Sequence, residues 1–406
     1  MSHITVLDLS RVFAGPWAGQ MLADFGADVI KIEHVRGGDD VRRMGVPHLD
    51  ADGEDTGLTS SFIAMNRGKK SLAIDLSKPE GQRIVADLAA QADVLIENFK
   101  VGNMAKFNLD YDALSKVNPG LIYCSITGFG QTGSRAHLPG YDPIFQAMTG
   151  VMSITGTADG QPGAGPNLVG YSISDINAGY YSVIAILAAL NHRDAGSGQG
   201  QGQHIDIALY DSQVHAASHI GMNYLSSGQI PQRNGTASMI TCPWQVFDAA
   251  DKPIMIAVGN DPQFKRLCDL LECGNLAADA RFATNLDRVQ HRDILVPLLA
   301  ERIAGWAAEK LQENLEAVGI AAGPILGFDE VLESQQFQER QLKRTVQHPR
   351  VGEIDVIANP IVFSQTPNVY DRAPPELGAD TDVVLRTLLN LSEEEIATLK
   401  SNGIVC

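Results

Sequence analysis

The sequence predicts an α/β fold in which a parallel sheet is covered by helices on both faces. From the start of the chain to about residue 190, short runs of branched apolar residues alternate with runs of helical periodicity. Residues 94–96 and 121–123 are apolar at consecutive positions, as in parallel strands that are buried on both faces. Strand, helix and strand at this spacing form βαβ units.

The elements follow one another in a regular order. The first three are a strand in ITVLDLS (4–10), a helix in AGQMLADFGA (18–27) and a strand in DVIKIEH (28–34). Further elements are expected in SLAIDL (71–76), PEGQRIVADLAAQA (79–92), DVLIENF (93–99), YDALSKVNP (111–119) and LIYCSITGFG (121–130). Ligands bind at the carboxyl ends of such strands, so the candidate site loops are EHVRGGDD, ENFKVGNMAKF and SITGFGQTGSRAHLPGYD.

The composition changes after the first 224 residues, which predicts more than one domain. Residues 192–212 are rich in Gly and Gln and then become strand-like, which indicates a turn and an edge or crossover strand. Residues 225–330 hold a hairpin-like pair followed by helices, and we expect a smaller α+β domain there. In 331–406, HPRVGEIDVIANPIVFSQTP predicts two strands, and LSEEEIATLKSNGIV predicts a terminal helix that ends at Gly403.

Charge and cysteine content narrow the class of protein. The 406 residues carry a formal net charge of −17, which repels nucleic acid and anionic membranes, so neither is expected as a partner. The five cysteines form no C-x-x-C pair, and the first residues lack a signal peptide pattern; both suit a cytoplasmic protein. The longest apolar run, 180–190, is shorter than the ~18–20 residues of a membrane span and predicts a buried helix.

The motifs for common cofactors are incomplete. GFGQTG and VRGGDD do not lie in the first βα turn, so a nicotinamide cofactor is not expected. His215 and His219 are four residues apart but lack the Glu of H-E-x-x-H, so no metal is expected either. Lys70 in NRGKKS and Lys106 in NFKVGNMAKF are either solvated surface residues or, at one edge of the sheet, a patch that holds phosphates.

Asp175 stands directly in front of the apolar run in VGYSISDINAGYYSVIAILAALNHR (169–193). As an N-cap its carboxylate would accept a first-turn N–H bond and stabilise the helix by about 0.5–2 kcal/mol. Ser174 beside it can do the same. Alternatively, the positive end of the helix keeps a reactive carboxylate ionised there. The residues themselves favour the cap.

Several motifs in one order resemble the class III CoA-transferases, the family of formyl-CoA and carnitine CoA-transferases. They are VLDLSRVFAGPWAGQMLADFGADVIKIE, NRGKKSLAIDL, ADVLIENF, SITGFGQTG with GYD after it, the Asp before ILAAL, VGNDPQF and AAGPI. The resemblance implies a Rossmann-like large domain built from both chain ends, with 331–406 returning to it, a small domain, and two chains interlocked as a homodimer. The resemblance also implies that the substrates are a coenzyme A thioester and small carboxylic acids, and that no cofactor is permanently bound.

The resemblance also implies roles for single residues. Asp175 matches the nucleophilic aspartate, which would form an aspartyl anhydride and then an aspartyl-CoA thioester. Positions of the CoA site are matched by Asn98, Phe99 and Lys106, and positions near the thioester by Tyr141 and Asp142. Gly259 and Asn260 lie in the loop that covers the active site. Phe13 and His34 stand where formyl-CoA transferase has Gln and Arg, and Arg36 is placed to compensate for the second change.

The substrates are the least defined part of the function. The motifs look closest to the branch that moves CoA between short dicarboxylates, such as succinate with itaconate, mesaconate or glutarate. Two alternatives are an α-methylacyl-CoA racemase, which would have His in place of Tyr141, and a non-catalytic CoA-binding relative. A distal carboxylate needs a cation, and the candidates lie in or near the site loops: Arg42, Arg43, Arg67 and Arg135.

Overall fold

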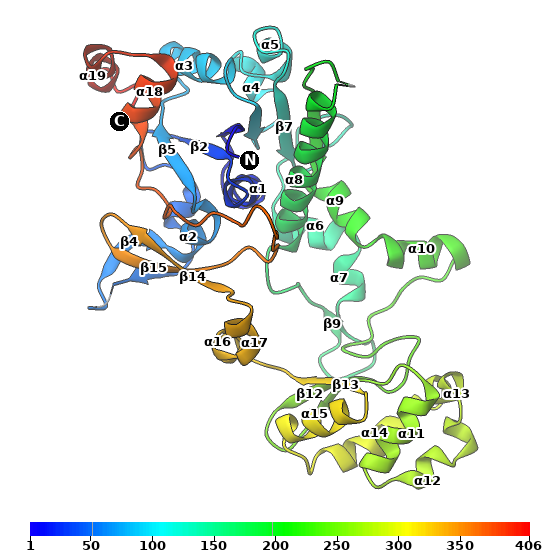
Figure 1. Cartoon of the computed structure of the whole chain (residues 1–406). Helices are drawn as coiled ribbons and strands as arrows, with labels where there is room; N and C mark the ends of the chain where they lie inside the picture. The colour runs from blue at the N-terminus through cyan, green and yellow to red at the C-terminus, as the bar shows by residue number, and fades with distance from the viewer. Residues whose placement is uncertain (51, 197) are drawn as a thin grey trace. The chain divides into compact units, whose positions relative to one another are not determined.

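The computed structural model describes residues 1–50, 52–196 and 198–406, and it contains a parallel sheet of six strands (Figure 1). The strand order is β10-β7-β6-β1-β2-β5, and every neighbouring pair is parallel. The strands are β1 (Thr5–Asp8), β2 (Asp28–Glu33), β5 (Lys69–Ala73), β6 (Val94–Glu97), β7 (Ile122–Thr127) and β10 (His204–Ala208). The predicted α/β class is confirmed, and β10 is an edge strand.

Helices cover both faces of this sheet because successive strand residues point to opposite sides. In β1, Val6 points toward α1 (Ala14–Asp24) and α8 (Ile173–Asp194), whereas Leu7 points toward α3 (Pro79–Ala89) and α18 (Thr381–Leu389). The same alternation separates Ile96 from Leu95 in β6. Further helices that pack on these faces are α4 (Asn103–Lys106), α5 (Tyr111–Leu114), α6 (Asp142–Met148), α9 (Leu209–Ala216) and α19 (Glu393–Ser401).

The chain forms two compact units. The larger unit comprises residues 1–151, 169–229 and 336–406, and it contains the parallel sheet. The smaller unit comprises residues 152–168 and 230–335, so most of the expected small domain lies in it together with a segment from the first half of the chain.

The smaller unit has an antiparallel sheet of three strands, β11 (Trp244–Asp248), β12 (Pro253–Ala257) and β13 (Ala321–Pro324). The hairpin-like pair expected after residue 225 is therefore β11 and β12. Helices follow it, as expected: α11 (Asp261–Leu270), α12 (Gly274–Ala277), α13 (Asn285–Gln290), α14 (Arg292–Ile303) and α15 (Ala308–Ala317).

The expected strand pair near residue 350 is shifted toward the N-terminus. The hairpin is β14 (Lys343–His348) with β15 (Gly352–Ile357), and 361–367 forms no strand. Strand β14 is mostly polar and exposed, so it has no apolar run to reveal it. Pro360 lacks the N–H that a ladder needs, which accounts for the end of pairing before IVF. The predicted terminal helix is α19, and Ser392 and Glu395 form its capping box.

Helix α8 is the one helix of the described chain that is long and apolar enough to cross a membrane, with a mean hydropathy of 1.4 in its most apolar window. One of its faces packs on the sheet through Ala178, Val183 and Ile186. The opposite face exposes Ile184 and Leu187, so the helix expected to be buried is buried on one side only.

Gly179 sets how closely α8 approaches α1. A Cβ at Gly179 would lie 2.9 Å from the Ala14 carbonyl oxygen, so Gly179→Ala should push the helices apart. We expect a loss of about 1–3 kcal/mol in the free energy of unfolding, measured by chemical denaturation. Gly221→Ala in α10 (Ser218–Ser227) is the matched control, because a Cβ there meets no atom within 4 Å. Equal stability of both variants would contradict the close contact.

Candidate functional site

Asp175 lies in the first turn of α8, at the third helical position. The N-cap is Ser172, whose side chain makes no capping hydrogen bond. The Asp175 carboxylate is half-buried, and it accepts no hydrogen bond from any residue that the structure describes. The capping interpretation is therefore wrong, because the carboxylate stabilises no first-turn N–H group.

A different carboxylate caps this turn. Asp142, at the start of α6 (Asp142–Met148), accepts the backbone N–H of Ser174 at 2.7 Å. Its other oxygen accepts the Gln146 side-chain amide at 2.7 Å. The side-chain Oε1 of Gln146 in turn accepts the N–H of Val169 at 2.9 Å, which fixes the segment that leads into α8. Asp142 and Gln146 together hold the turn while the Asp175 carboxylate stays unengaged.

The environment of Asp175 favours the neutral acid. Burial, and secondly the charge of nearby Asp142, raise the pKa of Asp175 from 3.8 to about 7. A half-buried carboxyl group with no partner and a raised pKa is typical of functional sites. Because its pKa lies near neutrality, Asp175 still ionises at physiological pH and can then act as a nucleophile.

The first turns of α8 lie against the first turn of α1. Gly179 and Ala14 are in close approach, and the rings of Trp17 and Tyr180 meet edge to face at 6.2 Å. Phe13 precedes α1 as its N-cap residue and packs with Trp17 against an apolar cluster of Val41, Phe62 and Met65. The structure thus places Phe13 at the same end of α1 that α8 contacts.

A pocket of about 270 Å³ opens where β1, β2 and β5 end, and we call it the carboxyl-edge pocket. It brings together two predicted residues, His34 and Phe99. Asn98 fixes one wall, because its amide oxygen accepts the Arg11 N–H at 2.9 Å and its amide nitrogen donates to the Arg11 carbonyl at 2.7 Å. The remaining lining residues are Leu9, Ser10, Arg11, Lys31, Ile32, Glu33, Asp39, Ile74, Asp75, Leu76, Ser77 and Phe107.

The two predicted lysines do not share an edge of the sheet. Lys69 begins β5 in parallel register with Val29, so Lys70 lies where the strands begin, and it pairs with Asp28 at 2.7 Å. Lys106 follows the end of β6, at the opposite edge. The expectation of a common patch is wrong, because a segment before one parallel strand and a segment after another lie at opposite edges.

Two other predicted residues of the CoA site are at the surface. Lys106 is exposed, with its ammonium 3.1 Å from the Asn103 side-chain oxygen, one residue before Phe107 of the carboxyl-edge pocket. Arg36 is exposed, and its backbone N–H donates to the His34 ring at 3.0 Å. Both side chains are therefore open to solvent beside residues that line the pocket.

Tyr141, Gly259 and Asn260 are also exposed. Tyr141 precedes α6 as its N-cap, next to Asp142, and the residue is 72% exposed. Gly259 and Asn260 belong to the smaller unit, where the Asn260 side chain caps α11 by accepting the Gln263 N–H at 2.9 Å. The GNDPQF segment thus forms a helix start.

Of the four candidate arginines, two are bound to buried carboxylates. Arg42 pairs with Glu33 and Arg67 with Asp24, each at 2.7 Å. Arg43 is exposed and lies 3.2 Å from Asp40. Arg135 is exposed above the Phe129 ring at 5.8 Å and makes no ion pair with any described residue.

Sequence reasoning missed two polar residues that hydrogen-bond predicted site residues, Gln146 to Asp142 and Glu97 to Phe99. Gln146 connects Asp142 to the chain that enters α8, and only the fold brings these segments together. Glu97 ends the apolar strand β6 and is buried. A lone carboxylate at the end of VLIE was a usable signal. Apart from residues 51 and 197, the structure contains no group of three His, Cys, Asp or Glu that is arranged to hold a metal ion.

Comparison with known proteins identifies the class. A family model described as CoA-transferase family III matches residues 1–381, and the chain belongs to this family. A succinate–glutarate CoA-transferase from Agrobacterium fabrum is 46% identical over 96% of this chain and 95% of its own length. A succinyl-CoA:glutarate CoA-transferase from Mus musculus is 37% identical over 100% of this chain and 90% of its own length. The crystal structure of a CAIB/BAIF family protein from Brucella suis superposes with a TM-score of 0.85 at 42% identity and covers 95% of this chain and 98% of that one.

The raised pKa of Asp175 links stability to pH. The pKa is about 7 in the folded chain against 3.8 ordinarily, so between these values the folded state binds more protons than the unfolded state. Stability is therefore lost as pH rises through this window, and Asp175→Asn removes the loss. We expect the variant to melt a few degrees above the wild type at about pH 8 and nearer to it at about pH 4, by calorimetry.

The control is Asp211→Asn, which makes the same exchange at an exposed position in the first turn of α9. Its Tm should stay within about 1 °C of the wild type at both pH values. A stabilisation by Asp175→Asn that does not change with pH would contradict the raised pKa.

Proposed function

We propose that this protein is an acyl-CoA:carboxylate CoA-transferase that moves CoA between succinate and another short dicarboxylate, with glutarate as the leading acceptor. The observation that carries the proposal is Asp175, a half-buried carboxylate without a hydrogen-bond partner among the described residues, whose pKa is raised to about 7. The family and the activities named for the relatives support the reaction and its substrates.

In the proposed mechanism the ionised Asp175 attacks the thioester carbonyl of succinyl-CoA. A C–O bond forms, the C–S bond breaks, and the products are an aspartyl–succinyl anhydride and CoA thiolate. The thiolate then attacks the Asp175 carbonyl and gives an aspartyl-CoA thioester, and succinate leaves with one of the aspartate oxygens. The acceptor acid repeats the two steps in reverse order, so no net hydrolysis or oxidation occurs.

Asp142 supports this chemistry by position. It caps the first turn of α8, so the turn needs no capping bond from Asp175. Its charge beside Asp175 disfavours a second negative charge there. The attack on the thioester relieves this repulsion, because the Asp175 carboxylate becomes a neutral anhydride and then a neutral thioester. We assign Asp142 and Gln146 as positioning residues for the nucleophile.

We propose that the nucleotide part of CoA occupies the carboxyl-edge pocket. In open α/β sheets, ligands bind at this edge. The pocket offers aromatic walls in Phe99 and Phe107, and His34 at its rim, and these side chains suit a purine base. Lys106 and Arg36 are exposed next to the lining residues and are free to meet phosphates.

The central prediction concerns Asp175→Asn. Because the amide cannot form the anhydride, transfer of CoA from succinyl-CoA to glutarate should fall by at least about 10³-fold, while CoA still binds. Mass spectrometry of the acyl-CoA products measures transfer, and calorimetry measures binding. Asp211→Asn should transfer CoA at the wild-type rate. A fully active Asp175→Asn variant would exclude the proposed nucleophile, and α-proton exchange without transfer would indicate a racemase.

We further propose that two chains form a homodimer, interlocked as the family resemblance implies. Helix α10 has no buried residue, yet it carries large exposed apolar side chains, and α8 exposes others. Uncovered apolar surface of this extent is typical of an interface. The side chains are Tyr180, Ile184 and Leu187 on α8, and Met222, Tyr224 and Leu225 on α10.

Sedimentation should show a dimer that persists on about 100-fold dilution. Leu225→Asp should release monomer, because it puts a charge into the proposed interface. Val117→Asp is the matched control at an exposed valine outside α8 and α10 and should leave the dimer intact. A stable wild-type monomer would overturn the proposal.

A further inference from the structure

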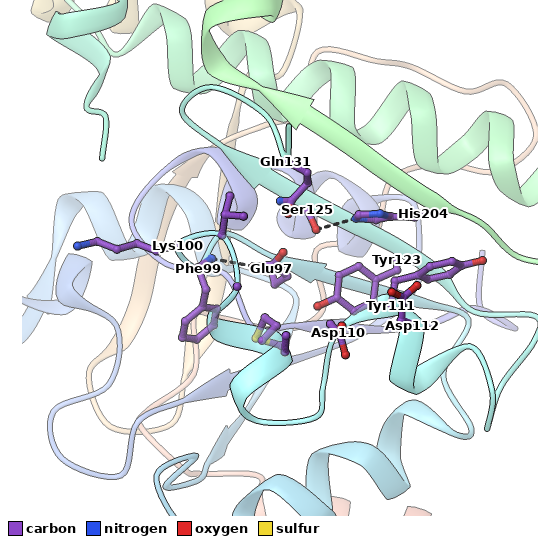
Figure 2. Close-up of a pocket in the computed structure, with 14 residues that line it drawn as sticks. Glu97, Phe99, Lys100, Asp110, Tyr111, Asp112, Tyr123, Ser125, Gln131 and His204 are labelled. Carbon is purple, nitrogen blue, oxygen red and sulfur yellow. Dashed lines mark hydrogen bonds between the residues drawn. The ribbon is translucent and has the colours of Figure 1, made fainter. Parts of the chain in front are cut away.

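A second pocket, of about 280 Å³, lies on the sheet face opposite to α8. Its floor is formed by β6, β7 and β10, and its wall by the segment that follows β6 (Figure 2). We call it the inner pocket. Phe99 lines both the inner pocket and the carboxyl-edge pocket, so the two spaces share one wall. The proposed mechanism uses no residue that lines only the inner pocket.

Three polar side chains cross the floor of the inner pocket in one row. Glu97 and Ser125 are register partners on β6 and β7, and His204 begins the edge strand β10. The Ser125 side chain lies beside the Glu97 carboxylate, and its oxygen lies 3.0 Å from the His204 Nε2 (Figure 2).

The row ends on the turn that carries the predicted CoA residues. Glu97 is only 4% exposed, and its carboxylate accepts the backbone N–H of Phe99 at 2.8 Å. Asn98 lies between these two residues, and both the oxygen and the nitrogen of its side-chain amide hydrogen-bond the Arg11 backbone. The Arg11 guanidinium lies 5.6 Å from the centre of the Phe99 ring. The turn of Asn98 and Phe99 is therefore held on one side by Glu97 and on the other by Arg11.

We propose that Glu97 is a positioning residue for the nucleotide part of CoA. It holds Asn98 and the Phe99 ring in the conformation that shapes the carboxyl-edge pocket. This inference rests on the proposed function and extends it to a residue that touches neither the reacting atoms nor the bound nucleotide. Glu97 should govern affinity for CoA and leave the chemistry at Asp175 unchanged.

A pH effect should accompany this role. Burial raises the pKa of Glu97 to about 7, although the nearby Ser125 hydroxyl and the hydrogen bond from the Phe99 N–H lower it. The ionised carboxylate accepts the Phe99 N–H more strongly than the neutral acid, so the turn is held better above this pH. The charged and titratable groups facing Glu97 from the surrounding elements are Asp206 and His204 on β10, Tyr123 on β7, Lys100 after β6, and Asp110, Tyr111 and Asp112 at α5.

The test measures CoA binding by calorimetry together with steady-state transfer kinetics. Glu97→Ala should weaken CoA binding about 10-fold and raise KM for succinyl-CoA equally, because a charge-assisted hydrogen bond is lost. The kcat and the KM for glutarate should stay within about twofold of the wild type. Glu97→Gln keeps an acceptor for the Phe99 N–H and should restore most of the affinity.

The affinity of Glu97→Gln relative to wild type should fall by about threefold between about pH 6 and about pH 8, since only the wild type gains a charge. The matched control is Asp112→Asn, which removes a carboxylate that lines the same pocket outside the row and should bind CoA like the wild type.

Two results would overturn the inference. One is Glu97→Ala with wild-type affinity for CoA in a preparation whose wild type transfers CoA. The other is an equal loss of kcat, glutarate KM and CoA affinity that Glu97→Gln does not restore, which would indicate a purely structural role. A wild type that neither binds CoA nor transfers it would overturn the proposed function itself.

Discussion

The hydrogen bond from the Ser174 N–H to Asp142 determines what Asp175 can do. The first-turn N–H groups of a helix need partners, and a local carboxylate is their usual acceptor. Here the acceptor comes from α6, at 2.7 Å, and Asp175 in the same turn accepts no such bond from any residue that the structure describes. Asp142 also adds a negative charge nearby, which together with burial raises the pKa of Asp175 to about 7. Asp142 thus caps the turn in place of Asp175 and also contributes to the raised pKa of Asp175.

The proposed nucleophile and the polar row of the inner pocket lie on opposite faces of the sheet. Asp175 lies on the side of α1 and α8, where Gly179 permits close packing against Ala14. The row of Glu97, Ser125 and His204 lies on the opposite face. The carboxyl-edge pocket opens where the strands end, and Phe99 connects it to that row. Because strand residues alternate in direction, the last residues of β6 already divide between the two sides.

The sequence was sufficient for the α/β class and for most strands of the parallel sheet, because these depend on local apolar runs. Strand β14 was missed because its residues are polar and exposed, and the pairing depends on β15. Lys70 was placed at the wrong edge of the sheet. The register of β5 against β2 decides at which edge Lys70 lies, and this register is not visible in the sequence. Asp175 was noticed, but its capping role was overestimated. Asp142 caps the turn instead, and Asp142 lies more than 30 residues earlier in the chain, where no local pattern connects it to α8.

Asp142 and Asn98 were expected at the site only through family resemblance, and their contacts show what they do: one caps α8 and the other ties two loops together. Gln146 and Glu97 act through backbone groups of distant segments, which no local pattern encodes. The packing of the two faces also depends on glycines such as Gly179, whose necessity appears only when the neighbouring helix is in place.

The most direct test of the proposed mechanism traces an oxygen atom from the acceptor acid into the Asp175 carboxylate. In the proposed mechanism, glutarate labelled with ¹⁸O in its carboxylates leaves one labelled oxygen on the aspartate when the aspartyl–glutaryl anhydride is cleaved by CoA thiolate. After a single turnover with one equivalent of succinyl-CoA, a proteolytic peptide that contains Asp175 but not Asp142 should gain about 2 Da, and the peptide with Asp142 should gain nothing. If the label instead appears in the released succinate while the Asp175 peptide keeps its mass, the two acids react directly and Asp175 is not the nucleophile.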